Sequence, residues 1–331
     1  MADTNSVLVI GEIHGGTLSS VSAEALGCGR KLADDLGGKL SALLIGNDVS
    51  AAAKDAVAFG ADTVYTVEDG LLAEYQSDSF TAAAEKAVRE ISPTVIVTGH
   101  TSMGSDIAPR LAFRLETAAL MDCINLEVDG DSKRLRLTKP VYGGNAQAVY
   151  AIDTDPQIAT VRVKSMTPLV KDTARTGDIV KIDAGIDASV VRAKVIEKVV
   201  EEVQGIKLED ATIIVSGGRG VGGPEGFTQL EQLAKLLKGA VGASRPACDN
   251  GWMPEKAQVG LTGTIVTPDL YIAVGISGAS QHIAGCSGAK SIVAINKDAD
   301  ANIFRFAHYG VVGDWKKLLP AFTEKVKELT A

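Results

Sequence analysis

Several features are scarce in this 331-residue chain, and each absence narrows the class of protein. The four cysteines stand singly, without metal-ligand spacing, so we expect buried, reduced thiols and no metal site. No apolar stretch approaches the ~20 residues of a membrane-spanning helix, and residues 1–5 lack the features of a signal peptide. The net charge of −8, without a long basic run, argues against nucleic-acid binding. We therefore expect a soluble, cytoplasmic chain that neither inserts into a membrane nor binds nucleic acid.

What the chain has in quantity is glycine and apolar residues: 35 glycines and 46% apolar residues, against only 5% aromatics. This composition suits an α/β protein with many tight turns. The first hundred residues alternate short apolar runs with helical spacing, which predicts a mostly parallel sheet flanked by helices. The strands predicted there are Val7–Ile10, Leu40–Ile45, Thr63–Val67 and Thr94–Thr98, and the helices include Ala51–Phe59 and Phe80–Ile91. We interpret His100 as a satisfied surface histidine and Ser105 or Asp106 as the N-cap of a helix over Ile107–Leu115.

The pattern changes between Lys133 and Val163, where apolar and polar residues alternate around turns. We predict an antiparallel addition to the first sheet there, with strands at Ala146–Ile152 and Gln157–Val163. Next come an extended excursion over Thr167–Asp187 and a segment, Val190–Val203, that fits a strand or a helix. The domain boundary is predicted at Gln204-Gly205, which divides the chain into domains 1–203 and 204–331.

The second domain restarts the strand and helix alternation. Its strands are predicted at Ala211–Ser216, Gly239–Ala243, Leu270–Val274 and Ser291–Ile295, and its helices at Thr228–Lys238 and Trp315–Leu329. The last helix is expected to bury Leu318, Leu319, Phe322, Val326 and Leu329. The fold class is therefore α/β, with two α/β domains.

Small residues follow the strand Leu270–Val274, from Gly275 to Ser280, and a short helix opens at Gln281-His282. Strand, loop and helix start together direct several backbone N–H groups to one point, which suits a phosphate. Asn296 ends the next strand, at the carboxyl edge where ligands of open α/β sheets bind. The small residues could equally serve packing in a plain βαβ turn, but histidine and asparagine at these places favour a nucleotide cofactor.

A second glycine pattern, from Gly218 to Gly223, fits G-x-G-x-x-G after a strand and before a helix. An NAD site also needs an acidic residue at the end of the second strand, to hold the ribose hydroxyls. That strand ends in Ser244-Arg245, and the nearest acid is Asp249, beyond a proline. We therefore reject the NAD interpretation.

Several motifs together carry a family resemblance. L-Y-I-A-V-G-I-S-G-A-S-Q-H followed by V-A-I-N-K-D, with S-G-G-R-G and G-A-S-R-P upstream and Y-G-V-V-G-D downstream, resembles the electron transfer flavoprotein alpha subunit. The resemblance implies FAD as the cofactor. It also implies an N-terminal adenine-nucleotide-hydrolase-like domain against a beta subunit and a C-terminal doubly wound FAD-binding domain that moves as a body.

The resemblance assigns roles to particular side chains. It implies that His282 bonds the flavin C2 carbonyl, that Ser244, Arg245 and Thr262 lie near the flavin N5 edge, and that Arg219 lies over the ring or pyrophosphate. Asn296 and Asp314 are expected at the adenosine end, although Asp314 also suits the N-cap of the last helix. The full set of expected cofactor-binding residues is Arg219, Ser244, Arg245, Gln258, Thr262, Gly275, Ser277, Gly278, Gln281, His282, Asn296 and Asp314.

The chain departs from the family at four positions. Leu261 and Thr264 stand where the family has Gln and Lys, Ser280 replaces a branched apolar residue, and Ser105 replaces an Arg. The first three changes leave FAD binding in place and alter the surroundings that set the flavin potential.

The function implied is electron transfer without a catalytic nucleophile or acid–base pair. The chain would pair with a beta subunit and shuttle electrons from an acyl-CoA-type flavoprotein dehydrogenase to a quinone-linked or other acceptor. The alternatives are a subunit of an electron-bifurcating, NADH-using complex, an NAD-dependent oxidoreductase, and a nucleotide-binding regulatory module.

Overall fold

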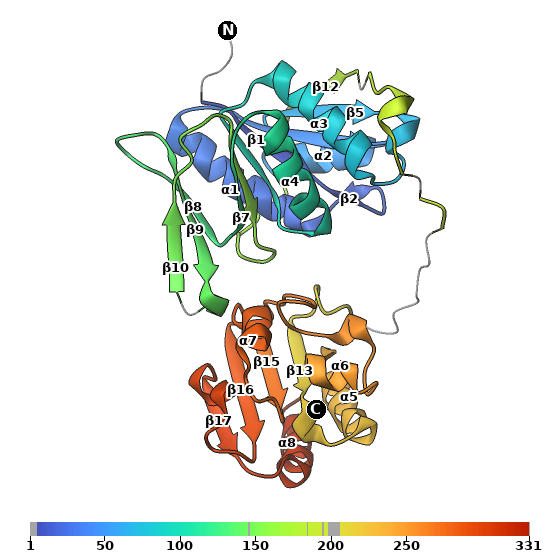
Figure 1. The fold of residues 1–331 in the computed structure, drawn as a ribbon, viewed down its shortest axis with the longest axis vertical. Helices are drawn as coiled ribbons and strands as arrows, with labels where there is room; N and C mark the ends of the chain where they lie inside the picture. Colours follow the sequence, from blue (N-terminus) through green and yellow to red (C-terminus); the bar gives the residue numbers. More distant parts are fainter. Residues whose placement is uncertain (1–4, 145, 184, 194, 198–205, 331) are drawn as a thin grey trace. The chain divides into compact units, whose positions relative to one another are not determined.

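The computed structural model describes residues 5–144, 146–183, 185–193, 195–197 and 206–330. By their contacts, residues 1–141 and 147–199 form one compact unit, and residues 142–146 and 200–331 form a second. Each unit is an open sheet covered by helices (Figure 1), which confirms the prediction of two α/β domains with parallel sheets. The predicted boundary at Gln204-Gly205 and the end of the Val190–Val203 segment lie outside the described residues.

The first unit is built on seven strands that are all parallel. Their spatial order is β12-β5-β4-β1-β6-β11-β7. The strands are β1 (Val7–Gly11), β4 (Leu40–Gly46), β5 (Thr63–Glu68), β6 (Val95–Gly99), β7 (Ala119–Cys123), β11 (Gln157–Val161) and β12 (Asp178–Ile182). The central strands are mostly apolar and are buried on both faces, as in other parallel sheets.

Successive residues of β1 pack on opposite faces of this sheet, since side chains alternate along a strand. Val7 and Val9 join the core under α1 and α2, while Leu8 and Ile10 join the core under α3 and α4. The helices are α1 (Ser20–Leu36), α2 (Ser50–Ala58), α3 (Ser77–Ile91) and α4 (Ser102–Arg114). Helix α4 begins earlier than predicted because Thr101, not Ser105 or Asp106, is its N-cap and accepts the Gly104 N–H at 3.1 Å.

Two predictions about the first sheet are wrong: the antiparallel pairing of Gln157–Val163, and the attachment of the other antiparallel strands to this sheet. Gln157–Val163 was predicted as part of an antiparallel addition, but β11 lies inside the sheet and pairs in parallel with β6 and β7. The antiparallel strands form a separate sheet of order β10-β9-β8, comprising β8 (Asn125–Val128), β9 (Leu135–Val141) and β10 (Ala146–Tyr150). Within the predicted excursion, β12 adds an edge strand to the main sheet beside β5.

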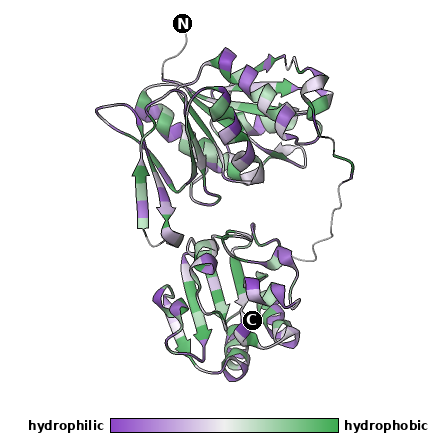
Figure 2. Cartoon of the chain, in the orientation of Figure 1, coloured by the Kyte–Doolittle hydropathy of each residue, from purple (hydrophilic) through white to green (hydrophobic). Residues whose placement is uncertain are grey.

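The second unit holds five parallel strands in the order β14-β13-β15-β16-β17. Tyr271 and Ala273 of β15 pack on the side of α7, and Ile272 and Val274 on the side of α5, α6 and α8. The elements are β13 (Ile213–Gly217), α5 (Pro224–Leu236), β14 (Ala240–Ala243), α6 (Arg245–Asp249), β15 (Leu270–Val274), α7 (Ser280–Cys286), β16 (Ser291–Asn296), β17 (Tyr309–Val312) and α8 (Trp315–Thr330). Figure 2 shows hydrophobic residues concentrated in the strands of each unit.

Short elements complete the chain. They are the hairpin of β2 (Ile13–His14) and β3 (Thr17–Leu18) and the 3₁₀ turns Gly70–Leu72, Tyr142–Gly144, Ala188–Val190, Arg219–Val221, Glu255–Ala257 and Asn302–Arg305. Three of the five residues that helix α8 was predicted to bury, Leu318, Leu319 and Val326, pack on the core. The other two are exposed, Phe322 by 37% and Leu329 by 77%. Among the described residues, no helix is long and apolar enough to cross a membrane.

Candidate cofactor-binding site

The predicted cofactor-binding residues lie in the loops that follow the carboxyl ends of the second sheet's strands or in the segment beside them. The strand order reverses direction at β13, because α5 leaves β13 toward one face and α7 leaves β15 toward the other. In open α/β sheets, ligands bind in the crevice at such a reversal.

A cavity of about 330 Å³ opens at this point. Three predicted residues line it: Gly275, Asn296 and Asp314. The lining also includes residues that were not predicted to bind the cofactor, namely Gly220, Val221, Gly222, Ile295, Lys297, Gly313, Trp315 and Lys316. The Trp315 indole N–H donates to the Gly220 carbonyl at 3.2 Å, so the first turn of α8 is tied to the loop after β13. In the sequence, the tryptophan directly after Asp314 could have indicated that the start of α8 lines the cavity.

The loop after β15 turns its carbonyl groups inward. The Ile276 carbonyl accepts from Asn296 Nδ2 at 2.9 Å, the Ser277 carbonyl from the Ile303 N–H at 3.1 Å, and the Gly278 carbonyl from Asn302 Nδ2 at 2.6 Å. By contrast, the successive N–H groups of residues 277–281 have no hydrogen-bond partner within the described part of the chain. This loop therefore presents a row of donors, as an anion-binding loop does.

Glycine is required at Gly278, where φ is +83°. A Cβ at this position would lie 2.3 Å from the Ile303 nitrogen. The close approach fixes the loop against the 3₁₀ turn Asn302–Arg305, and Asn296 anchors it from the next strand. Asn296 thus holds the loop in place in addition to lining the cavity.

Two residues that the sequence named separately are in contact. Gln258 Nε2 donates to Thr262 Oγ1 at 3.0 Å, which orients the exposed threonine. The segment around them lies along α7, since the Leu261 N–H donates to the Gln281 carbonyl at 2.8 Å. Leu261 itself is 60% exposed, so the apolar side chain at this departure from the family points to solvent.

The two predicted cations have different surroundings. Arg219 begins the turn after β13 and is exposed. Arg245 begins α6, after Ser244, which is the buried N-cap of that helix. Arg245 Nε lies 3.5 Å from Asp249 Oδ2, one helical turn on. The Asp249 carboxylate therefore offsets part of the charge that Arg245 brings to the edge of the sheet.

His282 is buried, with 6% of its surface exposed. Its Nε2 lies 2.9 Å from the Tyr271 hydroxyl, and its Nδ1 is buried without a hydrogen-bond partner among the described residues. Burial lowers the pKa of His282 to about 4, against a smaller opposite effect of the Val259 carbonyl. The imidazole is therefore neutral near pH 7 and carries one proton on one of its two nitrogens.

Asp314 precedes α8 and caps it. Its Oδ1 accepts the Lys316 N–H at 3.0 Å, as expected for an N-cap, and its side chain is exposed at the cavity. One carboxylate thus serves the helix and faces the space where a ligand would lie.

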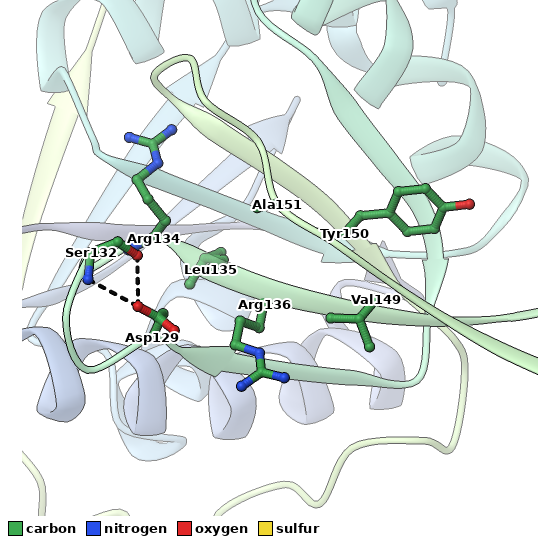
Figure 3. Close-up of a pocket in the computed structure, with 8 residues that line it drawn as sticks. All are labelled: Asp129, Ser132, Arg134, Leu135, Arg136, Val149, Tyr150 and Ala151. Carbon is green, nitrogen blue, oxygen red and sulfur yellow. Dashed lines mark hydrogen bonds between the residues drawn. The ribbon is translucent and has the colours of Figure 1, made fainter.

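The first unit has a cavity of its own, of about 290 Å³, beside β9 and β10. Figure 3 shows the guanidinium groups of Arg134 and Arg136 pointing away from each other. Arg134 is committed to local structure, since it bonds the Ile152 and Thr154 carbonyls and Asp155. His100 is half-buried and hydrogen-bonded to Thr160 Oγ1 at 2.9 Å, and burial lowers its pKa. These contacts hold the unit together.

Comparison with known proteins agrees with this geometry. Residues 7–187 match the electron transfer flavoprotein domain, and residues 207–287 match the electron transfer flavoprotein FAD-binding domain. The electron transfer flavoprotein subunit alpha of Thermoanaerobacterium thermosaccharolyticum is 45% identical over 99% of this chain and 100% of the relative. This chain belongs to the electron transfer flavoprotein alpha subunit family.

Other relatives of the family span the chain equally fully. The subunit alpha of Bacillus subtilis is 44% identical over 98% of both chains, and Protein FixB of Clostridium saccharobutylicum is 40% identical over 99% of this chain and 98% of the relative. These matches confirm the resemblance found in the sequence, the electron-transfer role and FAD as the cofactor.

The residues at the sheet edge fit an FAD. The donor row of residues 277–281 suits its pyrophosphate, and the cavity next to Asp314 suits a ribose. The buried Nδ1 of His282 is a polar atom whose partner is missing from the described residues. A buried polar atom without a hydrogen-bond partner destabilises the fold unless a ligand supplies that partner.

Proposed function

We propose that this chain is the FAD-holding subunit of a heterodimer with an electron transfer flavoprotein beta subunit. Residues 1–203 would contact the beta subunit, and residues 204–331 would hold one FAD. The complex would accept electrons from a flavoprotein dehydrogenase of acyl-CoA or fatty acid oxidation and pass them to a quinone-linked or other acceptor in the cytoplasm. The observation that carries the proposal is the donor row of residues 277–281 beside the cavity at the strand-order reversal.

The bound FAD supplies the one-electron chemistry, and the chain supplies electrostatics. Donors and cations near the ring favour its negatively charged, reduced form. His282, Arg245 and the Gln258–Thr262 pair are the proposed groups. A hydrogen bond to a charged group contributes roughly 1.5–3 kcal/mol, and about 1.4 kcal/mol corresponds to ~59 mV for one electron, so each hydrogen-bond donor could shift the first potential by ~60–130 mV. The exposed Arg245 acts through its charge alone and contributes less.

The glycine pattern Gly218–Gly223 does not favour an NAD site. Strand β14 ends at Ala243, and the Ser244-Arg245 that follows has no acidic side chain to hold ribose hydroxyls. The nearest acid, Asp249, lies beside Arg245. The pattern instead serves backbone packing, because a Cβ at Gly218 would lie 2.3 Å from the Gly275 carbonyl oxygen.

The test is coexpression with the beta subunit, followed by an absorption spectrum and extraction of FAD per alpha chain. We expect a flavin spectrum and no more than one FAD on the isolated alpha chain. Two tightly held flavins on alpha alone would contradict the single site. A colourless complex that reduces or oxidises NAD would favour the oxidoreductase, and a colourless one without redox activity the regulatory module.

A pair of variants locates the cofactor. Gly278→Ala should displace the donor row and weaken FAD retention at least tenfold. Gly251→Ala is the matched control, because Gly251 also has a positive φ, +71°, but no atom within 4 Å of the added methyl group. Equal FAD retention in both variants would place the pyrophosphate elsewhere.

A further inference from the structure

Tyr271 lies in the middle of the second core and touches the imidazole expected at the flavin. Its side chain is fully buried on β15, and its hydroxyl is 2.9 Å from His282 Nε2. The hydroxyl has one hydrogen and the neutral imidazole has one N–H, so this contact can be made in two ways. Which way it is made decides what His282 offers on its other nitrogen.

In one arrangement, the Tyr271 hydroxyl donates to Nε2, so the imidazole proton sits on Nδ1. The Val259 carbonyl then faces an N–H group, which agrees with its effect of raising the His282 pKa. The Nδ1–H remains without a full hydrogen bond inside the described part of the chain, as does the Ser216 hydroxyl beside Tyr271.

In the other arrangement, Nε2–H donates to the Tyr271 oxygen. The tyrosine hydrogen would then turn toward the buried Ser216 Oγ, which acts on the Tyr271 hydroxyl but falls short of full hydrogen-bond geometry. The Nδ1 lone pair would also face the Val259 carbonyl. The Val259 carbonyl decides between the two arrangements, because it attracts an Nδ1–H group and repels an Nδ1 lone pair, so the first arrangement is the stable one.

We propose that Tyr271 is a positioning residue that holds His282 in the Nδ1–H tautomer, so that the imidazole presents a donor to the flavin. The inference rests on the proposed function for the flavin contact and on this chain's own geometry for the tautomer. Burial raises the pKa of Tyr271 well above its usual range, so the hydroxyl keeps its proton near neutral pH.

Another histidine of the chain serves as an internal standard for measuring the His282 tautomer. It has four histidines, and His308 makes the opposite contact, because its Nδ1 accepts the Ile292 N–H at 3.0 Å. A neutral His308 must therefore carry its proton on Nε2. Nitrogen-15 NMR of the histidine-labelled full complex distinguishes the two tautomers of each ring. We expect Nδ1–H for His282 and Nε2–H for His308, whereas Nε2–H at His282 would overturn the inference.

Tyr271→Phe tests the consequence for electron transfer. We expect the complex to keep its FAD, an Nε2–H signal to emerge at His282, and the equilibrium constant of one-electron reduction to fall about tenfold, which is about 59 mV. Tyr75→Phe is the matched control, since it removes a tyrosine hydroxyl that donates to Asp106 at 2.6 Å in the first unit. An unchanged tautomer and potential in Tyr271→Phe would overturn the positioning role.

The proposed function and the proposed role of Tyr271 would be contradicted by different results. A complex without FAD would contradict the proposed function, and the tautomer would still be measured on the wild-type protein. A yellow complex with Nε2–H at His282 would leave the function in place and remove Tyr271 from it. If Tyr271→Phe does not fold, the wild-type spectrum decides the inference by itself.

Discussion

Gly220 and Gly275 lie back to back at the strand-order reversal: the Gly220 N–H donates to the Gly275 carbonyl at 3.0 Å. A Cβ on Gly275 would lie 2.8 Å from the Gly220 carbonyl carbon, and one on Gly220 would lie 2.9 Å from the Gly275 Cα. The loops after β13 and β15 thus touch through their backbones. Both glycines line the cavity, so this backbone contact closes one side of it. No side chain fits between the two loops.

We predict that Gly275→Ala destabilises the second domain by roughly 2–5 kcal/mol. A non-glycine residue in the left-handed region costs about 1–2 kcal/mol, and the φ of Gly275 is +62°. Overpacking against Gly220 adds about 1–3 kcal/mol. Gly222→Ala is the control: φ is +93°, but the methyl group meets no atom within 4 Å. Denaturant unfolding measures both, and equal losses would show that the loops separate freely.

The charge at Arg245 should tune the flavin potential. We expect Arg245→Ala to lower the first reduction potential and Asp249→Asn to raise it, because the second change removes the carboxylate that offsets Arg245. Arg245 is 65% exposed, so the effect should stay below about 40 mV, given about 1 kcal/mol for an exposed charge interaction and 59 mV per 1.4 kcal/mol. Stepwise reductive titration measures both shifts. Shifts of the same sign in the two variants would mean that Arg245 is only a surface cation.

His282 should couple the potential to pH. With its pKa at about 4, the imidazole is neutral between pH 6 and 8 before reduction. Negative charge on the reduced ring raises that pKa, and proton uptake then makes the potential fall as pH rises. Tyr271 and Cys286 stay protonated in this range, because burial raises both of their pKa values. We predict that His282→Gln keeps FAD and flattens the dependence, measured by potentiometry from pH 6 to 8; an identical slope would leave His282 a packing residue.

Glu24 should make the first domain less stable as pH rises. Its carboxylate is buried on α1 and accepts the Lys164 N–H at 2.7 Å, yet burial raises its pKa from 4.5 to about 7. The unfolded chain releases this proton above pH 4.5 and the folded chain only near pH 7, so stability is lost between these values and then levels off.

Glu24→Gln should remove this loss and be more stable than the wild type at pH 8, by up to roughly 3 kcal/mol, since each pKa unit is about 1.4 kcal/mol. Denaturant unfolding from pH 5 to 8 measures it. Glu90→Gln, on the exposed side of α3, is the control and should track the wild type. Parallel pH curves for Glu24→Gln and the wild type would refute the buried-carboxyl explanation.

The sequence predicted the carboxyl edge of the second sheet well, because the strands that lead to this edge are apolar on both faces. Leu270–Val274 is the same in prediction and structure, and Ser291–Ile295 differs by one residue. Once parallel strands are located, the loops at their carboxyl ends must share one edge, so Gly275, Asn296 and Asp314 could be placed together. Gln258 and Thr262 were named separately, and the structure joins them by a hydrogen bond.

Pairing partners could not be predicted, because they depend on contacts far along the chain. Alternation between Lys133 and Val163 suggested antiparallel strands throughout, yet β11 is inserted beside β6, some sixty residues earlier in sequence. Strand β12 was missed because four of its five residues are exposed at the sheet edge. Tyr271 was seen as part of an apolar run; its contact with His282 follows from the side of β15 that α7 covers.

The separation between a rigid sheet and the loops after its carboxyl ends also bears on how this protein could be re-engineered. Mutagenesis libraries confined to the exposed side chains of these loops, such as Arg219, Arg245, Leu261 and Thr262, would sample new potentials and partners while leaving the two cores unchanged. We expect most functional variants from such libraries to differ in colour or potential and to keep the fold. Libraries aimed at the strands themselves should mainly yield insoluble protein.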